Sequence, residues 1–390
     1  MNAEPTSPVA GAVLRRARYA DTLIFFVNGV MFASWVARIP QVQDSLDISE
    51  GSLGLALLVL ACGALLSLLI AGWLVARFGS RAVTATAALA LCLFLPFPAL
   101  ANSWALLAAA LFMVGIANGA LDVAMNSQGV LIQRHIGRPI LSSMHAAFSF
   151  GGFAGAATGG IVAAAGVSPA AHLTGVAVLS GAAMLVAGRL LLDAENDLQR
   201  DGPSFASPSR ALAALGIIAF CGLLAEGAVG DWSAVYLSNV LETGPGLAAG
   251  GFAAFSLTMA CGRLIGDRLV FLFNPTTVVR YGGIVATVGM VLALAFGNPY
   301  LTILGFALVG AGLSNIVPII FSAAGQTPGI APGPAIAAVA SSGYFGFLAG
   351  PPVIGLAAEL ISLRGSLVML ILLAAVIALL AGKVRPAGSS

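Results

Sequence analysis

The 390-residue sequence contains very little charge. Only 8% of its residues are Asp, Glu, Lys or Arg, 59% are hydrophobic, and the mean hydropathy is +1.02. A soluble globular domain carries about 25% charged residues, so this chain lacks the polar side chains that would cover a water-facing surface. The shortage excludes a cytosolic enzyme, a nucleic-acid-binding protein and a disordered scaffold. The net charge of +2 is too small to indicate any partner.

Residues for common catalytic and cofactor sites are also scarce. Lys383 is the only lysine, which excludes a Walker A loop because that loop ends in Gly-Lys-Ser/Thr. The three histidines and four cysteines lack metal-binding spacing, and we expect the cysteines to be small buried apolar residues. An intramembrane enzyme would need a paired acid/base cluster, and a channel would need a filter-like loop; neither is found. We therefore expect no enzyme, no cofactor and no metal.

Apolar runs long enough to cross a bilayer as helices recur along the whole chain. The alternating pattern of a membrane β-barrel is missing. The sequence predicts an all-α membrane protein of twelve transmembrane helices. We expect them at residues 21–39, 52–76, 82–101, 104–130, 140–165, 170–192, 210–238, 246–270, 276–296, 300–325, 333–360 and 362–382.

A polar stretch at residues 193–209 divides the chain into two groups of six spans, 1–192 and 210–390. With both termini inside, fifteen basic residues fall on the inner side and only Arg38 and Arg364 on the outer side, as the positive-inside rule requires. Residues 1–19 hold no apolar stretch, so we expect no cleavable signal peptide. These observations predict a multi-pass protein of the plasma (inner) membrane, with 193–209 as a cytoplasmic linker and both termini cytoplasmic.

The two groups of spans repeat weakly and in the same order. Asn28 and Trp35 in span 1 are echoed by Glu226 and Trp232 in span 7, about 200 residues later. Ser142-Ser143-Met144-His145 in span 5 is echoed by Ser341-Ser342-Gly343-Tyr344 in span 11, at about the same offset. Duplication of a six-helix unit is typical of secondary transporters, whose substrate site lies near the midplane between the repeats.

Two loops carry a recognisable pattern. Residues 72–81 read Gly-Trp-Leu-Val-Ala-Arg-Phe-Gly-Ser-Arg, and residues 262–268 read Gly-Arg-Leu-Ile-Gly-Asp-Arg. The first resembles the G-x-x-x-D-R-x-G-R-R/K loop of the major facilitator superfamily, with Ala76 where the family has an acid, and the second resembles its degenerate copy. The resemblance implies two pseudo-symmetric six-helix bundles that rock about a central cavity.

The same resemblance implies that these loops act as cytoplasmic latches. The latch candidates are Arg77, Arg81, Arg263 and Asp267. Arg77 and Arg81 lie at a helix end, where a guanidinium can meet a carboxylate or the carbonyls of a helix C-terminus. The alternative is that the two arginines are only topology markers that face lipid phosphates.

A third stretch narrows the resemblance. Asp122-Val-Ala-Met-Asn126, then Met144-His145, then Phe148-Ser-Phe-Gly-Gly152 is similar to the fucose-permease-related branch of the superfamily. That branch implies a proton-coupling carboxylate in span 4. It also has an acid in span 1, whereas the matching stretch from Asn28 to Arg38 has none.

Span 4 carries Asn118, Asp122 and Asn126 at spacings of four residues, which place them on one helical face. A charged side chain at a helix centre costs about 2.5–3.5 kcal/mol on insertion scales, so this face should point into the bundle or into a water-filled cavity. An isolated carboxylate there suits a group that binds and releases a proton. The alternative is an interhelical hydrogen-bond network that holds span 4 in place.

Glu226 and His145 are the other candidates for proton coupling. Glu226 lies near the middle of span 7 and is followed by Gly227, Gly230 and Asp231, which predict a broken helix beside a cavity. The alternative is that Glu226 only joins the two halves by pairing with Asn28. His145 titrates near neutrality when unperturbed and forms either a relay with Asp122 or a structural hydrogen bond.

The remaining candidates are predicted to contact substrate or to form an outer gate. Arg38 and Asp231 are candidates for an extracellular ion pair. Trp35 and Trp232 either stack on a substrate or anchor the interfaces. The predicted substrate-binding residues are Asn28, Trp35, Asn118, Asn126, Glu226, Trp232, Asn315 and Tyr344.

These residues predict a monomeric secondary transporter. The expected substrate is a small polar solute, neutral or cationic, sugar-like or amino-acid-like, because the interior candidates hold three carboxylates against Arg38 alone. The expected partners are that solute, protons and the lipid bilayer, with no nucleic acid. We expect proton-coupled symport by alternating access; a drug/proton antiporter and an uncoupled facilitator are the alternatives.

Overall fold

The computed structural model of the protein describes residues 11–138, 140–193, 210–328 and 330–384. The predicted linker lies outside these ranges except for Asp193. All regular structure in the described ranges is helical, and its elements run as follows: α1 (Gly11–Val36), α2 (Ile39–Leu46), α3 (Glu50–Phe78), α4 (Ser80–Phe94), η1 (Phe97–Leu100), α5 (Trp104–Ile136), α6 (Leu141–Ala164), α7 (Pro169–Gly188), α8 (Arg210–Val235), η3 (Tyr236–Val240), α9 (Pro245–Phe273), α10 (Pro275–Ala295), α11 (Pro299–Leu313), α12 (Ile316–Gly325), α13 (Pro332–Ile361), α14 (Leu363–Leu380) and η4 (Ala381–Lys383).

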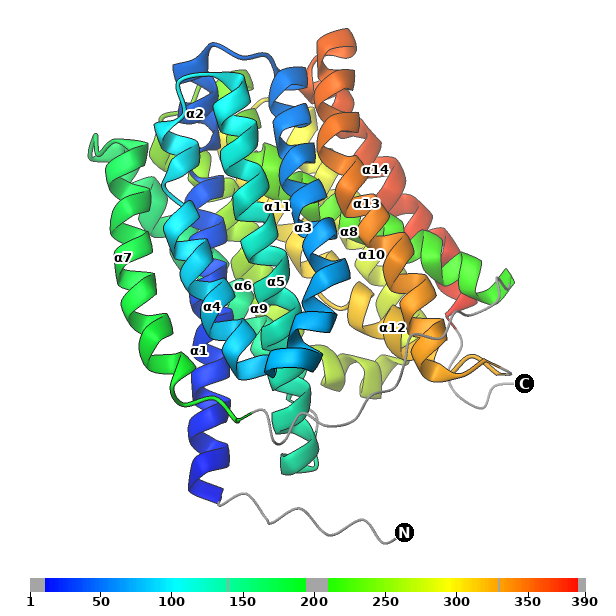
Figure 1. Ribbon diagram of the computed structural model, residues 1–390. Coiled ribbons are helices and arrows are strands. Elements are labelled where there is room, and N and C mark those ends of the chain that lie inside the picture. Colours follow the sequence, from blue (N-terminus) through cyan, green and yellow to red (C-terminus); the bar gives the residue numbers. More distant parts are fainter. Residues whose placement is uncertain (1–10, 139, 194–209, 329, 385–390) are drawn as a thin grey trace, which may run out of the picture.

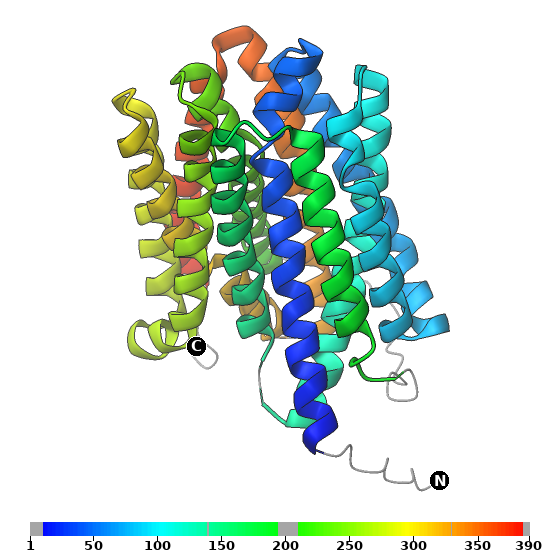
Figure 2. The ribbon, with the colours of Figure 1, turned by 90° about the vertical axis from the view of Figure 1, so that its left-hand side faces the viewer.

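Twelve helical units among the described residues are long and apolar enough to cross a membrane, which confirms the predicted fold class. The first unit, Gly11–Leu46, is longer than predicted because α1 begins ten residues earlier and α2 continues it. We call α1–α7 with η1 the N-half, and α8–α14 with η3 and η4 the C-half. The two halves form side-by-side bundles, and the described start of α1 lies at the lower end (Figures 1 and 2).

Local sequence signals explain where the helices begin. Ser103 and Ser168 are N-caps whose side chains accept hydrogen bonds from the backbone of α5 and α7. Asn298 does the same for α11, which begins with Pro299. The cysteines of the chain are free, and Cys62 and Cys261 are exposed rather than buried, which corrects the prediction for those two.

The sequence predicts a helix break in span 7, and the structure has none beside Glu226. Helix α8 is continuous through Gly227 and Gly230, so the predicted break beside Glu226 is wrong. These glycines instead leave room for aromatic rings, since a Cβ on Gly227 would touch Phe347 and one on Gly230 would touch Phe32. A break does occur in the tenth span, where the helix is interrupted at Ser314–Asn315 between α11 and α12.

Small residues allow the helices to approach closely, as the glycine spacing in span 5 predicts. A Cβ on Gly151 of α6 would lie 2.0 Å from the carbonyl oxygen of Phe26 in α1. The halves meet along two helix pairs, α6 with α9 and α3 with α13. A Cβ on Gly54 would lie 2.7 Å from the carbonyl oxygen of Pro351, so the second pair also depends on backbone proximity.

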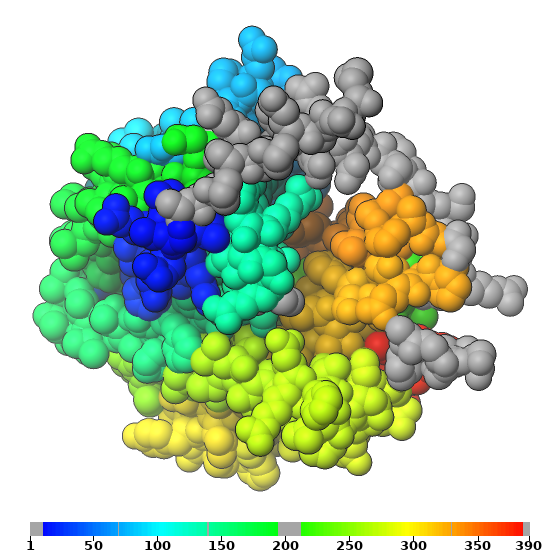
Figure 3. Space-filling model, turned by 90° about the horizontal axis from the view of Figure 1, so that it is seen from below, coloured from blue at the N-terminus to red at the C-terminus, as the bar shows by residue number. Residues whose placement is uncertain are grey.

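The halves are joined at the end of the molecule away from the described start of α1. There the Ser49 hydroxyl, at the start of α3, donates a 2.5 Å hydrogen bond to the Glu359 carboxylate in α13. The Asn239 amide donates to the Gln43 side chain at 3.3 Å, linking η3 with α2. From below, the opposite end is hollowed between the teal part of α5 and the orange α12 and α13 (Figure 3). The structure is therefore closed at its upper end.

Glycine packing yields a matched pair of substitutions. We expect Gly151→Ala to destabilise the protein by about 1–3 kcal/mol, because its Cβ must displace the α1 backbone. Gly175→Ala in α7 is the control, since a Cβ there meets nothing within 4 Å, and alanine favours the helix by up to about 1 kcal/mol. Thermal unfolding in detergent measures both. Equal stability of the two variants would contradict the close α1–α6 contact.

Candidate functional site

Arg263 of α9 joins an ion pair within the C-half to polar groups of the N-half. The Arg263 guanidinium in α9 donates to the Glu226 carboxylate in α8 at 3.3 Å. It also crosses to the N-half, where it donates to the Ser149 hydroxyl at 2.8 Å and to the His145 carbonyl at 3.5 Å. Arg263 was predicted to be a latch in a cytoplasmic loop. The placement in a loop is wrong, because α9 stays helical to Phe273 and Arg263 lies inside the span; the latch role of Arg263 stays a prediction.

The polar residues predicted for span 4, Asn118, Asp122 and Asn126, lie half-buried on α5. The Asn126 amide donates to both the carbonyl and the carboxylate of Asp122, at 2.8 Å and 3.2 Å. Asp122 lies close enough to Tyr344 of α13 for its charge to act on the phenol. Helix α5 belongs to the N-half and α13 to the C-half, so the charge of Asp122 acts on a residue of the opposite bundle.

Aromatic rings from both halves meet beside these charges. The Phe32 ring of α1 packs edge-on against the Phe252 ring of α9, with centroids 5.9 Å apart, and also contacts Phe148 of α6. Sequence analysis missed this cluster and selected the two tryptophans instead. Phe32 lies one helical turn after Asn28, a spacing that would have placed the ring on the same face.

His145 lies between the aromatic and charged groups. Its ring packs edge-on against Phe25 of α1, with centroids 5.2 Å apart. The charge of Arg263 acts on the same ring. The structure therefore brings together Glu226, His145, Arg263 and Ser149 at one cross-half site. Asp122 of α5 lies near Tyr344 of α13.

Four predicted substrate residues are not open to a solute in this structure. Asn315 is 8% exposed, and its amide donates to the Gly262 carbonyl at 3.0 Å, so it fastens the α11–α12 break to α9. Trp35 and Trp232 are buried at 3% and 0% exposure. Asn28 is also buried, and its Oδ1 has no hydrogen-bond partner among the described residues. A role of these four residues in substrate binding stays a prediction, and it would require a conformation that exposes them.

The predicted outer ion pair between Arg38 and Asp231 is not formed. Arg38 is fully buried within the N-half, where its Nε donates to His172 Nδ1 at 3.0 Å and its Nη1 to Gln41 at 2.6 Å. A neutral histidine nitrogen accepts this bond, so the guanidinium is held without a carboxylate. Asp231 lies half-buried on α8 with no ion pair to any described residue.

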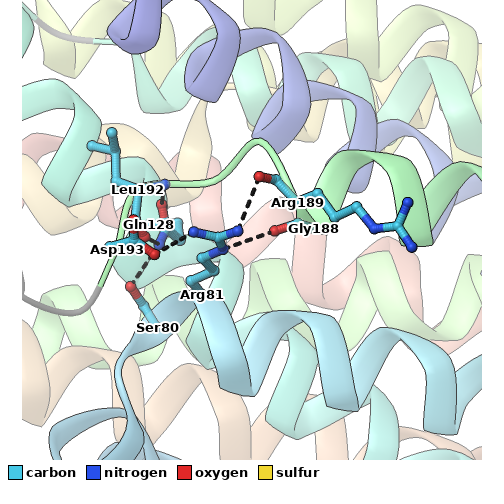
Figure 4. A network of polar contacts seen from close by, with 7 residues as sticks. All are labelled: Ser80, Arg81, Gln128, Gly188, Arg189, Leu192 and Asp193. Carbon is cyan, nitrogen blue, oxygen red and sulfur yellow. Dashed lines mark hydrogen bonds and ion pairs between the residues drawn. The ribbon is translucent and has the colours of Figure 1, made fainter. Parts of the chain in front are cut away.

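The first loop motif holds two helix ends together at the lower end of the N-half (Figure 4). The Arg81 guanidinium donates to the carbonyls of Gly188 and Arg189, at 3.2 Å and 3.0 Å, and pairs with the Asp193 carboxylate. Beside it, the Gln128 amide donates to Ser80 and to the Leu192 carbonyl. Arg81 thus meets a helix C-terminus and a carboxylate, whereas Arg77 and Asp267 are exposed.

Sequence analysis also missed a buried acid in span 1. Asp21 of α1 is fully buried, and neither of its carboxylate oxygens has a hydrogen-bond partner among the described residues. It packs against Gly129 of α5, two helical turns from Asp122 on the same helix. The stretch of span 1 that matches the acid-bearing part of the fucose-permease-related branch begins at Asn28 and does not include Asp21. No described group of three His, Cys, Asp or Glu side chains is arranged to hold a metal.

Twelve membrane-crossing helices, two bundles and interior charges where the bundles meet define a multi-pass membrane transporter. The family model of the Major Facilitator Superfamily matches residues 22–331. An uncharacterised MFS-type transporter of Yersinia pestis is 37% identical over 347 residues, covering 87% of this chain and 88% of the relative. The chain belongs to the major facilitator superfamily.

Solved structures share the fold at low sequence identity. The nucleoside transporter NupG superposes with a TM-score of 0.73 at 14% identity, covering 95% of this chain and all of NupG. FucP, a fucose:proton symporter of E. coli, superposes in its outward conformation with a TM-score of 0.65 at 19% identity, covering 94% of this chain and 98% of FucP. Their resemblance establishes the fold of this chain.

Burial predicts which positions water reaches. In a variant without the natural cysteines, we expect cysteines at Asn118 and Tyr344 to react with a small water-soluble thiol reagent, since neither position is buried. Cysteines at Asn28 and Asn315, which are 2% and 8% exposed, should stay unreactive. Labelling rates in proteoliposomes measure the difference. A cysteine at Asn315 that reacts as fast as one at Tyr344 would contradict the site described above.

Proposed function

We propose that this protein is a proton-coupled symporter for a small polar solute, neutral or cationic and sugar-like or amino-acid-like. The observation that carries the proposal is the set of ionisable groups at the meeting of the two halves, with the charge of Asp122 acting on Tyr344 of the opposite bundle. The proposed protein is a monomer in the plasma (inner) membrane with both termini cytoplasmic. Residues 1–192 and 210–390 are proposed as its two moving units.

The charge of the site supports the choice of solute. Asp122 and Glu226 supply two carboxylates, and Arg263 supplies one guanidinium that Glu226 already engages. Arg38 does not offset them, because it is buried among neutral partners in the N-half. An ionised Asp122 therefore leaves the site with an excess of negative charge, which repels anions and tolerates neutral or cationic solutes.

Asp122 is the proposed proton carrier. A carboxylate between helices in a bilayer is costly, and its one described side-chain partner is the neutral amide of Asn126. Protonation relieves this cost and removes the charge that acts on Tyr344. Asp21, buried two helical turns away beside Gly129, is proposed as a second proton-binding carboxyl on the route to the lower end.

In the proposed cycle, the solute binds beside the cross-half site with help from the hydroxyl and amide groups of Tyr344 and Asn118. Arg263, paired with Glu226 in the C-half, holds the bundles together through Ser149 and the His145 carbonyl while the site is reached from below. Rocking of one bundle against the other would break the Arg263 contact with Ser149 and the upper Ser49–Glu359 contact in turn. If the proton affinity of Asp122 differs tenfold between the two orientations of the bundles, the difference supplies about 1.4 kcal/mol of coupling free energy.

The variant Asp122→Asn tests the coupling role. We expect it to abolish solute accumulation driven by a pH gradient while leaving solute counterflow within about twofold of wild type, because an amide keeps the shape but cannot ionise. Both are measured in proteoliposomes with a panel of labelled monosaccharides, polyols, nucleosides and amino acids. Asp47→Asn, an exposed acid that follows α2, is the matched control and should retain both activities. Undiminished gradient-driven uptake by Asp122→Asn would remove Asp122 from the mechanism and leave Glu226 or His145 as the carrier.

A further inference from the structure

A groove lies between α4 and α7, on the side of the N-half away from the cross-half site. The two helices pack closely through small residues, since a Cβ on Gly188 would lie 3.2 Å from that of Ala85. The small residues form the floor of a cavity of about 340 Å³, and larger side chains form its walls. Its lining includes the apolar side chains of Phe78, Leu89 and Leu185 and the charged side chains of Arg81, Arg189 and Asp193.

The walls of this α4–α7 groove are apolar and face outward. Leu89, Leu185 and Phe78 are 37%, 48% and 54% exposed. They belong to or adjoin membrane-spanning helices, so the surrounding medium is lipid rather than water. An apolar groove in this position suits an acyl chain, which is the occupant that the bilayer itself supplies.

The lower end of the groove is positively charged. The Arg81 guanidinium is fixed there by the carbonyls at the C-terminus of α7 and is paired with Asp193. The Arg189 side chain is exposed and makes no hydrogen bond or ion pair with the described residues. It points away from the Arg81 network in Figure 4. The groove therefore ends in one neutralised guanidinium and one that is available to an anion.

We propose that the α4–α7 groove binds one anionic phospholipid from the leaflet at the lower end of the molecule. An acyl chain lies along Leu89, Leu185 and Phe78, and the phosphate pairs with Arg189. A guanidinium binds phosphate by charge-assisted, bidentate hydrogen bonds. Basic pockets between transmembrane helices on the cytoplasmic side are suited to anionic headgroups, and the positive-inside pattern predicts that this end is cytoplasmic.

The bound lipid would reinforce the junction where the N-half ends. Arg81 ties the start of α4 to the end of α7, and Asp193 is the last described residue of the N-half. A phosphate on Arg189 adds a contact at the same point without entering the cross-half site. The proposal does not depend on proton coupling or on the identity of the solute.

Native mass spectrometry of the detergent-solubilised full chain tests the proposal. Palmitoyl-oleoyl phosphatidylglycerol and phosphatidylcholine with the same acyl chains are titrated separately. We expect one phosphatidylglycerol molecule to bind at least about tenfold more tightly than phosphatidylcholine, since a charge-assisted contact is added to the same apolar burial. Equal affinity for the two lipids would overturn the proposal.

Three variants locate the site. Arg189→Gln should weaken phosphatidylglycerol binding about tenfold and leave phosphatidylcholine binding unchanged. Ala82→Trp, which fills the groove floor, should weaken the binding of both lipids. Arg268→Gln changes an exposed arginine on α9 in the C-half and should have no effect. A loss as large in Arg268→Gln as in Arg189→Gln would show unspecific charge attraction and overturn the site, and because Arg189 is exposed, its variant tests the proposal even if Ala82→Trp does not fold.

Discussion

Charge inside a bilayer is costly, and this constraint decides where the chemistry of the molecule lies. Lipid-facing positions are apolar, so the few interior charges must gather where helices cover them. Arg263 is the clearest case. Its guanidinium uses Glu226 in its own half and Ser149 in the other, so its position depends on both bundles. Any movement that separates the bundles at this level must leave that arginine with fewer partners.

The rest of the architecture is arranged around this contact. Small residues bring α6 against α9 and α3 against α13, which places neighbouring polar residues within reach of the opposite half. The Phe32–Phe252 pair adds an apolar contact between the same halves. Ser49 and Glu359 close the upper end, while the lower end is hollowed. A superfamily transporter open at one end and closed at the other suits the alternating access that we propose.

The sequence predicted the fold well because span length and hydropathy depend on local composition. The twelve spans are confirmed, as is membership of the superfamily. The site was harder to predict because the orientation of a side chain depends on how far a helix extends and on what packs beside it. Arg263 lies within the span predicted at 246–270, but the resemblance of residues 262–268 to the loop motif of the superfamily assigned it to a loop. Asn315 and Trp232 were assigned to a cavity because burial against a neighbouring helix leaves no signal in the sequence.

The burial of Asp21 was also not predictable from the sequence. Asp21 is the first residue of the span predicted at 21–39, so the sequence prediction placed it at a helix end. Only the extension of α1 to Gly11 and its packing against α5 show that the carboxylate is buried. The contact between Asn126 and Asp122 was predictable from the sequence. Helix geometry places residues that are four positions apart on the same face.

The central claim is that the interior charges set the balance between the two orientations of the bundles. The most direct measurement is the distance between spin labels at Arg134 and Gln326, which are exposed near the lower ends of α5 and α12. Pulsed electron resonance in lipid nanodiscs gives the distance distribution as pH is varied. The account predicts that the wild-type distribution shifts between a long and a short distance with pH, and that Asp122→Asn keeps one distribution throughout. A wild-type distribution that does not change with pH, or an Asp122→Asn variant that shifts as wild type does, would contradict it.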